Sequence, residues 1–329
     1  MATYVLGPAE VALGGSWGTG PSTRSPPRKG SVTRGTEVPR RKISLSLFFI
    51  PALILIVVFV VFPVLSTVYI SFFNPSGQFV GLNNYFDVLS RREVVNVERL
   101  SQGFPMGALV HNVIWILIHL PLSLFSGLVL AIFLGNVKGA SIVKSAIFLG
   151  MVTPMIVGGL ILRFTFERGV GVVNALFNLL GFEQLTRTWT AFPDTALFAL
   201  IFGSVWLWTG FSMILYSAGL ATIPKDYYEA AKIDGSTAFR TFYRITLPLL
   251  KPITLTVITM TILWELKIFD IVFVATLGGP GGASNVLALL MYNMAFRAFD
   301  FNSAAVVATF LTLLTLLVTV GMTRYMVRK

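Results

Sequence analysis

Long apolar stretches almost free of charge alternate with short polar segments along most of the chain. Six of them lie at about residues 45–73, 108–135, 143–166, 196–221, 249–276 and 301–326. Each is longer than the ~20 residues that a helix needs to cross a bilayer. Strands of a membrane barrel would alternate in polarity over segments of about ten residues, which these stretches do not. The pattern predicts an all-α integral membrane protein with six transmembrane helices.

Residues 1–42 differ from the rest of the chain. They are rich in Gly, Ser, Thr and Pro, and seven of them are basic whereas two are acidic. Such a segment buries too little apolar area to fold, which predicts a disordered basic tail. The apolar run that follows, 43–73, is too long for the core of a signal peptide, which is about 7–15 residues. We therefore predict a tail over 1–42 and a six-helix transmembrane domain over 43–329.

The distribution of Lys and Arg predicts the orientation of the chain. Basic residues are concentrated in the tail, in the loop from Lys225 to Lys251 and at the C-terminus. Because basic residues favour the cytoplasmic side, both termini are expected in the cytoplasm.

Composition narrows the possible functions. The chain is 55% hydrophobic and 12% charged, whereas soluble domains carry about 25% charged residues. Its net charge of +11 therefore indicates membrane lipid as the partner and not nucleic acid. Because the chain has no cysteine and two histidines, it offers no disulfide, thiolate zinc site or histidine-rich metal site.

The loop over 222–248 is the most informative polar segment. Pro224 suits a first helical turn, Glu229 suits its positive end, and Gly235 suits the left-handed residue that ends a helix. Ser236 is then predicted to cap a second short helix that stops before Leu247. Aromatic residues on one face of this second helix fit either a docking surface for a protein or a hairpin lying on lipid.

Three motifs in this sequence resemble one family. Glu229-Ala230-Ala231, Gly235 and the later Ile245-x-Leu247-Pro248 resemble, in order and spacing, the EAA loop of permease subunits of ABC importers. The segments 269–280 and 79–85 resemble the carbohydrate-uptake branch of that family, specifically its maltose-permease-like members. The likeness extends over about 45–327.

The resemblance implies a type I ABC importer permease fold in the cell membrane and a set of partners. These are a second, different permease, two cytoplasmic ATPases, an extracytoplasmic sugar-binding protein and a small carbohydrate. It also implies that the EAA loop couples the permease to the ATPase. The residues carried over for coupling are Glu229, Ala230, Ala231, Asp234, Gly235, Ile245, Leu247 and Pro248.

The chain lacks the signatures of catalysis. No glycine is followed by lysine, so no phosphate-binding loop is present, and ATP and Mg are expected on the partner subunits. The glycines of 278–282 are predicted to form an outer turn. His111 and His119 have no carboxylate near them in the sequence and are interpreted as interfacial or packing residues.

Charged residues inside the predicted helices are candidates for the substrate pathway, because each costs at least ~2.5 kcal/mol to insert. Arg163 is interpreted either as an anchor that holds the outer end of its helix at the membrane surface or as a residue of the substrate pathway. Lys267 and Asp270, three residues apart, are predicted to form a local ion pair. The resemblance places Thr261, Glu265, Gly210 and Met213 at sugar-contact positions, and Trp264 is the aromatic neighbour of Glu265.

The sequence thus predicts a non-catalytic permease subunit of an ATP-driven importer of disaccharides or oligosaccharides. A permease for polyols or glycerol phosphate is an alternative, although a phosphate calls for clustered arginines that the helices lack. A proton-coupled secondary transporter that uses Glu265 and Asp270 is a further alternative, but it calls for an inverted repeat that is not visible.

Overall fold

The computed structural model describes residues 45–135 and 137–327. It separates into two units, one ending at Pro51 and one comprising Ala52–Lys329, and the packing and the sites described below lie within the second. The predicted tail lies outside the described residues. All secondary-structure elements within the described residues are helices. The one β-type pairing there is an antiparallel bridge between Phe73 and Phe79.

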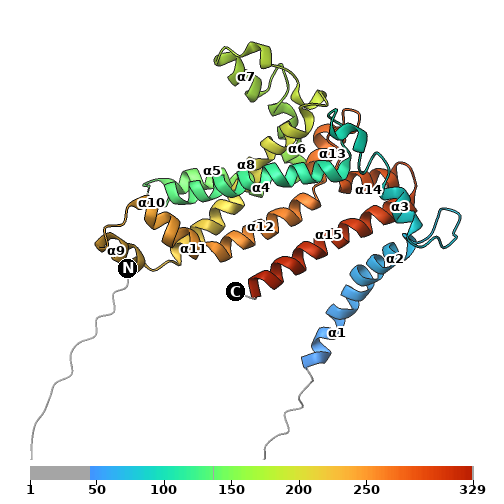
Figure 1. Cartoon of the computed structure of the whole chain (residues 1–329), viewed down its shortest axis with the longest axis horizontal. Coiled ribbons are helices and arrows are strands. Elements are labelled where there is room, and N and C mark those ends of the chain that lie inside the picture. Colours follow the sequence, from blue (N-terminus) through green and yellow to red (C-terminus); the bar gives the residue numbers. More distant parts are fainter. Residues whose placement is uncertain (1–44, 136, 328–329) are drawn as a thin grey trace, which may run out of the picture. The chain divides into compact units, whose positions relative to one another are not determined.

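The described α-helices are α1 (Leu45–Ile56), α2 (Phe62–Ile70), α3 (Asn83–Leu89), α4 (Ala108–Phe133), α5 (Ala140–Val152), α6 (Met155–Thr165), α7 (Val172–Leu179), α8 (Ala196–Ala221), α9 (Lys225–Ile233), α10 (Ala238–Thr241), α11 (Leu247–Leu249), α12 (Lys251–Leu266), α13 (Asp270–Thr276), α14 (Leu287–Phe296) and α15 (Phe301–Val327) (Figure 1). Single π-helical turns, Val57–Val61 and Phe242–Thr246, connect α1 to α2 and α10 to α11.

The spanning helices agree with the predicted pattern, with two bends. Four helices in the described chain are long and apolar enough to cross a membrane: Phe49–Ile70, α4, α8 and α15. The pair α5 and α6 is bent by 105°, and the pair Ala238–Leu249 and α12 is bent by 64°, so counting each pair as one span gives six. Thr153 is extended because Pro154 follows it, which explains the sharper bend.

The fifth predicted helix is not continuous. It was expected over 249–276, but α12 ends at Leu266 and α13 begins at Asp270. The chain turns away here because α13 packs against α6. Gly159 of α6 allows this approach, since a Cβ there would lie 3.1 Å from the Cα of Ile271. The short apolar helix α14 was also not predicted.

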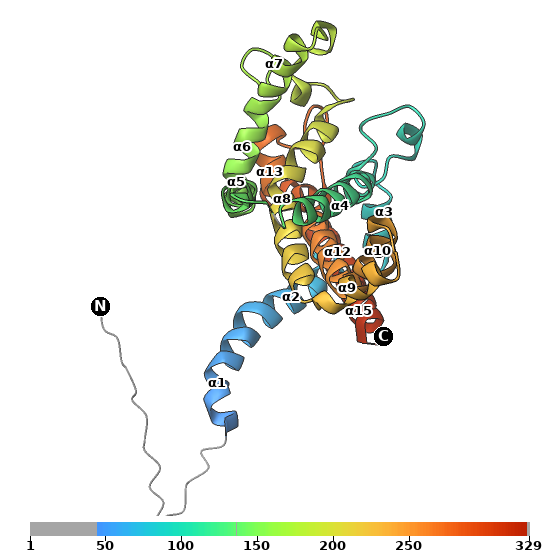
Figure 2. The same cartoon turned by 90° about the vertical axis from the view of Figure 1, so that its left-hand side faces the viewer.

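Helix α8 forms the centre of the packing and contacts α4, α5, α6, α12 and α13 (Figures 1 and 2). Small residues allow the close approaches. Gly127 of α4 faces Ser212, Gly210 faces the backbone of α5 at Phe148, and Gly219 faces Ile253 of α12. Helices that touch through their backbones leave little room for independent movement.

The ends of several helices meet at one end of the bundle. Asn302 at the start of α15 donates to the carbonyl of Phe73 (2.7 Å), just beyond α2. Leu287 N–H at the start of α14 donates to Asn112 Oδ1 of α4 (2.9 Å). The hairpin of α9–α11 lies at the opposite end of the bundle (Figure 1). This arrangement fits the predicted orientation, which itself stays a prediction.

Candidate functional site

The segment with the EAA motif forms an exposed helical hairpin. Helix α9 begins after Pro224 and ends at Ile233, and Gly235 follows with a left-handed φ of +67°. Ser236 N–H donates to the carbonyl of Ala231 (2.9 Å), and Gly235 N–H donates to that of Lys232 (3.1 Å). This pair of hydrogen bonds is the Schellman arrangement, which satisfies the last carbonyls of a helix. The predicted role of Gly235 in ending the helix is therefore confirmed.

The second half of the hairpin differs from the prediction. Thr237, not Ser236, caps α10, because its Oγ1 accepts a hydrogen bond from Arg240 N–H (3.3 Å). The helix also continues past the predicted stop before Leu247. A π-helical turn over Phe242–Thr246, with i to i+5 hydrogen bonds, precedes α11. Pro248, which has no N–H to donate, lies in the first turn of α11, directly after this change of hydrogen-bond pattern.

The residues of the hairpin divide into an inward and an outward set. Ala231 is buried, and Tyr228 reaches Thr246 through a hydroxyl contact of 3.2 Å. Glu229 and Ala230 are exposed. Large apolar and aromatic side chains also face outward, namely Tyr227, Ile233, Phe239 and Tyr243. The inward contacts thus connect the two halves of the hairpin, and its outward face is largely apolar.

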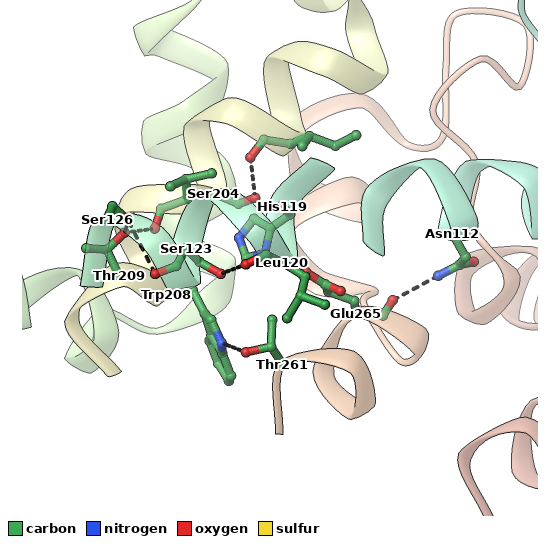
Figure 3. A network of polar contacts seen from close by, with 12 residues as sticks. Asn112, His119, Leu120, Ser123, Ser126, Ser204, Trp208, Thr209, Thr261 and Glu265 are labelled. Carbon is green, nitrogen blue, oxygen red and sulfur yellow. Dashed lines mark hydrogen bonds and ion pairs between the residues drawn. The ribbon is translucent and has the colours of Figure 1, made fainter. Parts of the chain in front are cut away.

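A buried polar pair lies within the spanning helices (Figure 3). His119 Nδ1 of α4 lies 2.6 Å from Glu265 Oε1 of α12, and neither side chain is exposed. Asn112 Nδ2, also on α4, donates to the backbone carbonyl of Glu265 (2.8 Å). Because His119 lies near the middle of the 26-residue helix α4, the pair lies near the middle of the membrane.

Two tryptophans adjoin this pair. The rings of Trp208 and Trp264 are stacked, with centroids 4.7 Å apart and an angle of 16° between their planes. The His119 ring lies 5.4 Å from that of Trp264. Trp208 Nε1 donates to Thr261 Oγ1 (2.7 Å), as Figure 3 shows. Both tryptophans are only half-buried, so part of each ring remains accessible.

The predicted pathway residues do not all come together. Thr261, Trp264 and Glu265 share the cluster around His119. Gly210 and Met213 are buried in the packing of α8. Asp270 is half-buried in the first turn of α13, and Arg163 is exposed in the last turn of α6.

Two sequence-based interpretations are wrong. Lys267 and Asp270 form no ion pair among the described residues, because the helix ends between them and they do not share one face. His119 does have a carboxylate partner, which the fold supplies from a distant part of the sequence. His111 is a packing residue as expected, since Nε2 accepts from Met106 N–H (3.1 Å) and Nδ1 donates to the carbonyl of Asn285 (2.8 Å).

Two members of the cluster, Asn112 and His119, were not among the predicted pathway residues. Both lie in the second apolar stretch, and their polarity at a spanning position was the available signal. Within the described residues no group of three or more His, Cys, Asp or Glu could hold a metal ion. The contacts of the cluster around His119 are hydrogen bonds and stacked aromatic rings.

A groove of about 410 Å³ lies elsewhere, between α2, α3 and α15. Apolar side chains dominate its lining, which consists of Val68, Phe72, Leu82, Tyr85, Phe86, Thr309 and Leu313. It contains none of the predicted pathway residues, and its apolar lining offers little to a hydroxylated substrate.

The comparisons with known proteins identify the family. The family of binding-protein-dependent transport system inner membrane components matches residues 123–329. A probable ABC transporter permease protein of Pyrococcus horikoshii is 58% identical over 279 residues, which are 84% of this chain and 96% of the relative. The chain belongs to the binding-protein-dependent ABC transporter permeases.

Further matches agree with this membership. The trehalose/maltose transport system permease protein of Thermococcus litoralis is 33% identical over 277 residues, which are 82% of this permease and 89% of the relative. A chain of a bacterial ABC transporter that imports the acidic polysaccharide alginate has the same fold, with a TM-score of 0.72 at 19% identity, covering 88% of this permease and 96% of that chain. The prediction of an all-α, multi-pass permease of the inner membrane is confirmed.

Proposed function

We propose that this permease forms half of the translocation pathway of an ATP-driven importer of disaccharides or oligosaccharides. The observation that supports it best is the half-buried pair of tryptophans beside Thr261 and Glu265, at the depth of the membrane centre. The C–H faces of a sugar ring stack on aromatic rings, and its hydroxyls need hydrogen-bond acceptors. Glu265 Oε2 has no hydrogen-bond partner among the described residues, and because it is buried in this conformation it becomes available to a sugar hydroxyl only when the permease opens.

The alternatives have less support. The relative from Thermococcus litoralis is named for trehalose and maltose, which favours a sugar over a polyol. Glycerol phosphate calls for cations in the cavity, but the cluster has no Arg or Lys, and Arg163 and Lys267 are exposed. Membership in an ABC family argues against a proton-driven transporter based on Glu265 and Asp270.

The permease acts with partners and performs no chemistry itself. In this proposal it pairs with a second, different permease, two cytoplasmic ATPases that bind ATP and Mg, and an extracytoplasmic sugar-binding protein. The alginate importer was solved with its periplasmic protein bound to an alginate pentasaccharide, which is the same type of partner.

The hairpin of α9–α11 is the contact with the ATPase. Exposed Glu229 offers a carboxylate to a basic group, and exposed Ala230 allows close approach of a partner surface. When ATP closes the ATPase dimer, the hairpins of the two permeases move together. The paired permeases then open outward to accept sugar from the binding protein, and hydrolysis restores the inward-facing state.

Affinity purification of the tagged permease from its native membranes tests this assembly. The parent chain is compared with Gly235→Trp and with the matched control Gly235→Asn. A Cβ at Gly235 meets nothing within 4 Å, so the effect of a substitution arises from the backbone angle and from the added surface. Asn tolerates a left-handed φ and adds little bulk, whereas Trp does neither.

The expected result is recovery of an ATPase and a second permease with the parent and with Gly235→Asn. Gly235→Trp should lose the ATPase or hydrolyse ATP without transporting sugar. The co-purified assembly then identifies the binding protein, whose ligand can be screened against sugars, polyols and glycerol phosphate. A chain that purifies alone and still transports would refute the proposed assembly.

A further inference from the structure

The segment between α6 and α8 forms a compact structure of its own, which includes α7 (Figures 1 and 2). Asn174 of α7 is buried and holds the segment together. Its Nδ2 donates to the carbonyls of Glu167 (2.9 Å) and Arg187 (3.0 Å), and its Oδ1 accepts from Arg187 N–H (3.1 Å) and Trp189 Nε1 (3.2 Å). Trp189 in turn stacks on Phe177 of α7, with centroids 5.6 Å apart. These contacts fix the orientation of α7 and therefore determine which of its side chains face outward.

Helix α7 exposes an apolar stripe although its inward face is already packed. Val173, Asn174 and Phe177 face inward, whereas the outward stripe, at i, i+4 and i+7, consists of Val172, Leu176 and Leu179. These three side chains are 73%, 55% and 85% exposed. A helix in contact with water places its polar residues outward. The medium around this stripe is therefore expected to be apolar.

Two observations indicate that this medium is lipid. Helix α7 follows α6 after six residues, and α6 carries exposed apolar side chains such as Leu160 and Phe164. Because α5 and α6 together have the length and composition of a membrane span, the apolar stripe of α7 follows directly on an element of membrane-spanning character. The other end of the segment carries Arg187, whose guanidinium lies 5.6 Å from the ring of Trp189. Tryptophan and arginine side chains are typical of the boundary between the membrane and water.

We propose that α7 is an interfacial helix whose Val172–Leu176–Leu179 stripe inserts among the acyl chains of the outer leaflet. Helices of this kind lie in the plane of the membrane with the apolar face buried by ~5–10 Å. In this position α7 supports the outer ends of α6 and α8. The placement does not depend on which substrate the importer carries.

Site-directed spin labelling tests this placement, because the chain has no cysteine of its own. Single Leu176→Cys and Leu179→Cys variants carry the label on the stripe. Gln184→Cys, an exposed polar position in the turn after α7, is the matched control. The labelled importer, purified as a complex, is reconstituted into vesicles of phosphatidylcholine and phosphatidylglycerol, and collisions with oxygen and with a water-soluble nickel complex are measured.

The expected result is an oxygen-to-nickel collision ratio that is several-fold higher at residues 176 and 179 than at residue 184. A stripe that is as accessible to nickel as residue 184 would lie in water, and the proposal would be wrong. Low collision rates with both reagents at 176 and 179 would instead place the stripe against a protein subunit, which also overturns it. Loss of sugar transport in the same sample would leave the collision ratio unaffected, so this test and that of the transport function fail independently.

Discussion

His119 Nδ1 on α4 lies 2.6 Å from Glu265 Oε1 on α12, across 146 positions of sequence, and both side chains are fully buried. A polar contact in the middle of a membrane-spanning bundle cannot exchange its partner for water without cost. The pair therefore fixes the position of α12 against α4, and with it that of the adjacent Trp264.

Removing one member of this pair should destabilise the permease strongly. His119→Leu or Glu265→Leu leaves the other group buried without its partner, and an unpaired buried polar group costs about 1–3 kcal/mol. Glu265→Gln keeps an oxygen in the same place and should cost less. Thermal unfolding in detergent, followed by tryptophan fluorescence, measures the difference. The double variant should lose much less stability to unfolding than the sum of the losses in the two single variants, since residues in contact are energetically coupled. Additive losses would mean that the two groups do not interact.

Thr261 gives a finer test of the tryptophan pair. Thr261→Val removes the acceptor of Trp208 Nε1 and should cost about 0.5–1.5 kcal/mol, because the half-buried indole N–H loses its hydrogen bond. Thr261→Ser retains the hydroxyl and should behave like the parent. Both stability and sugar uptake by reconstituted importer are measured. If Val and Ser give equal uptake, the orientation of Trp208 does not matter for transport.

Two adjacent alanines of the EAA motif should respond differently to the same change. Ala230→Phe adds an exposed ring and should prevent docking of the ATPase while the permease stays folded. Ala231→Phe forces a ring into a buried position, and such overpacking costs about 1–3 kcal/mol. Unfolding temperature and ATPase recovery distinguish the two outcomes. Equal effects of the two substitutions on stability would contradict the assignment of Ala230 to the outward face and Ala231 to the inward face.

Gly127 and Gly321 form a matched pair of glycine-to-alanine substitutions. A Cβ at Gly127 would lie 2.3 Å from Ser212 Cβ, so Gly127→Ala must separate α4 from α8 and should lower the unfolding temperature. A Cβ at Gly321 meets nothing within 4 Å, so Gly321→Ala should be neutral or stabilising by up to about 1 kcal/mol through helix propensity. A harmless Gly127→Ala would show that the two helices are not in close contact.

The apolar pattern was sufficient to locate most of the spanning helices, because the bilayer imposes length and polarity on each of them separately. Bends were harder to predict, although Pro154 was a visible signal for one. The break at Lys267–Phe269 depends on contacts between α13 and α6, which no local pattern encodes. The partner of His119 was missed for the same reason.

The coupling hairpin shows the opposite case. Its first half follows local rules, so Pro224 and Gly235 predicted the limits of α9 correctly. Ser236 and Thr237 are both good N-cap residues, so the sequence does not decide at which of the two positions α10 begins. Pathway roles for Gly210 and Met213 stay predictions, since they depend on a second permease and on other conformations.

The break between α12 and α13 has a consequence for hydration. Helix α12 has 16 residues and rises about 24 Å, which is less than the ~30 Å of the hydrocarbon core. Non-helical backbone at such a depth is tolerated only where protein encloses it or water reaches it. Because Lys267 at the break is exposed, we expect water to penetrate from the outer side as far as Leu266. A soluble substrate would then meet the barrier to transport only below Leu266.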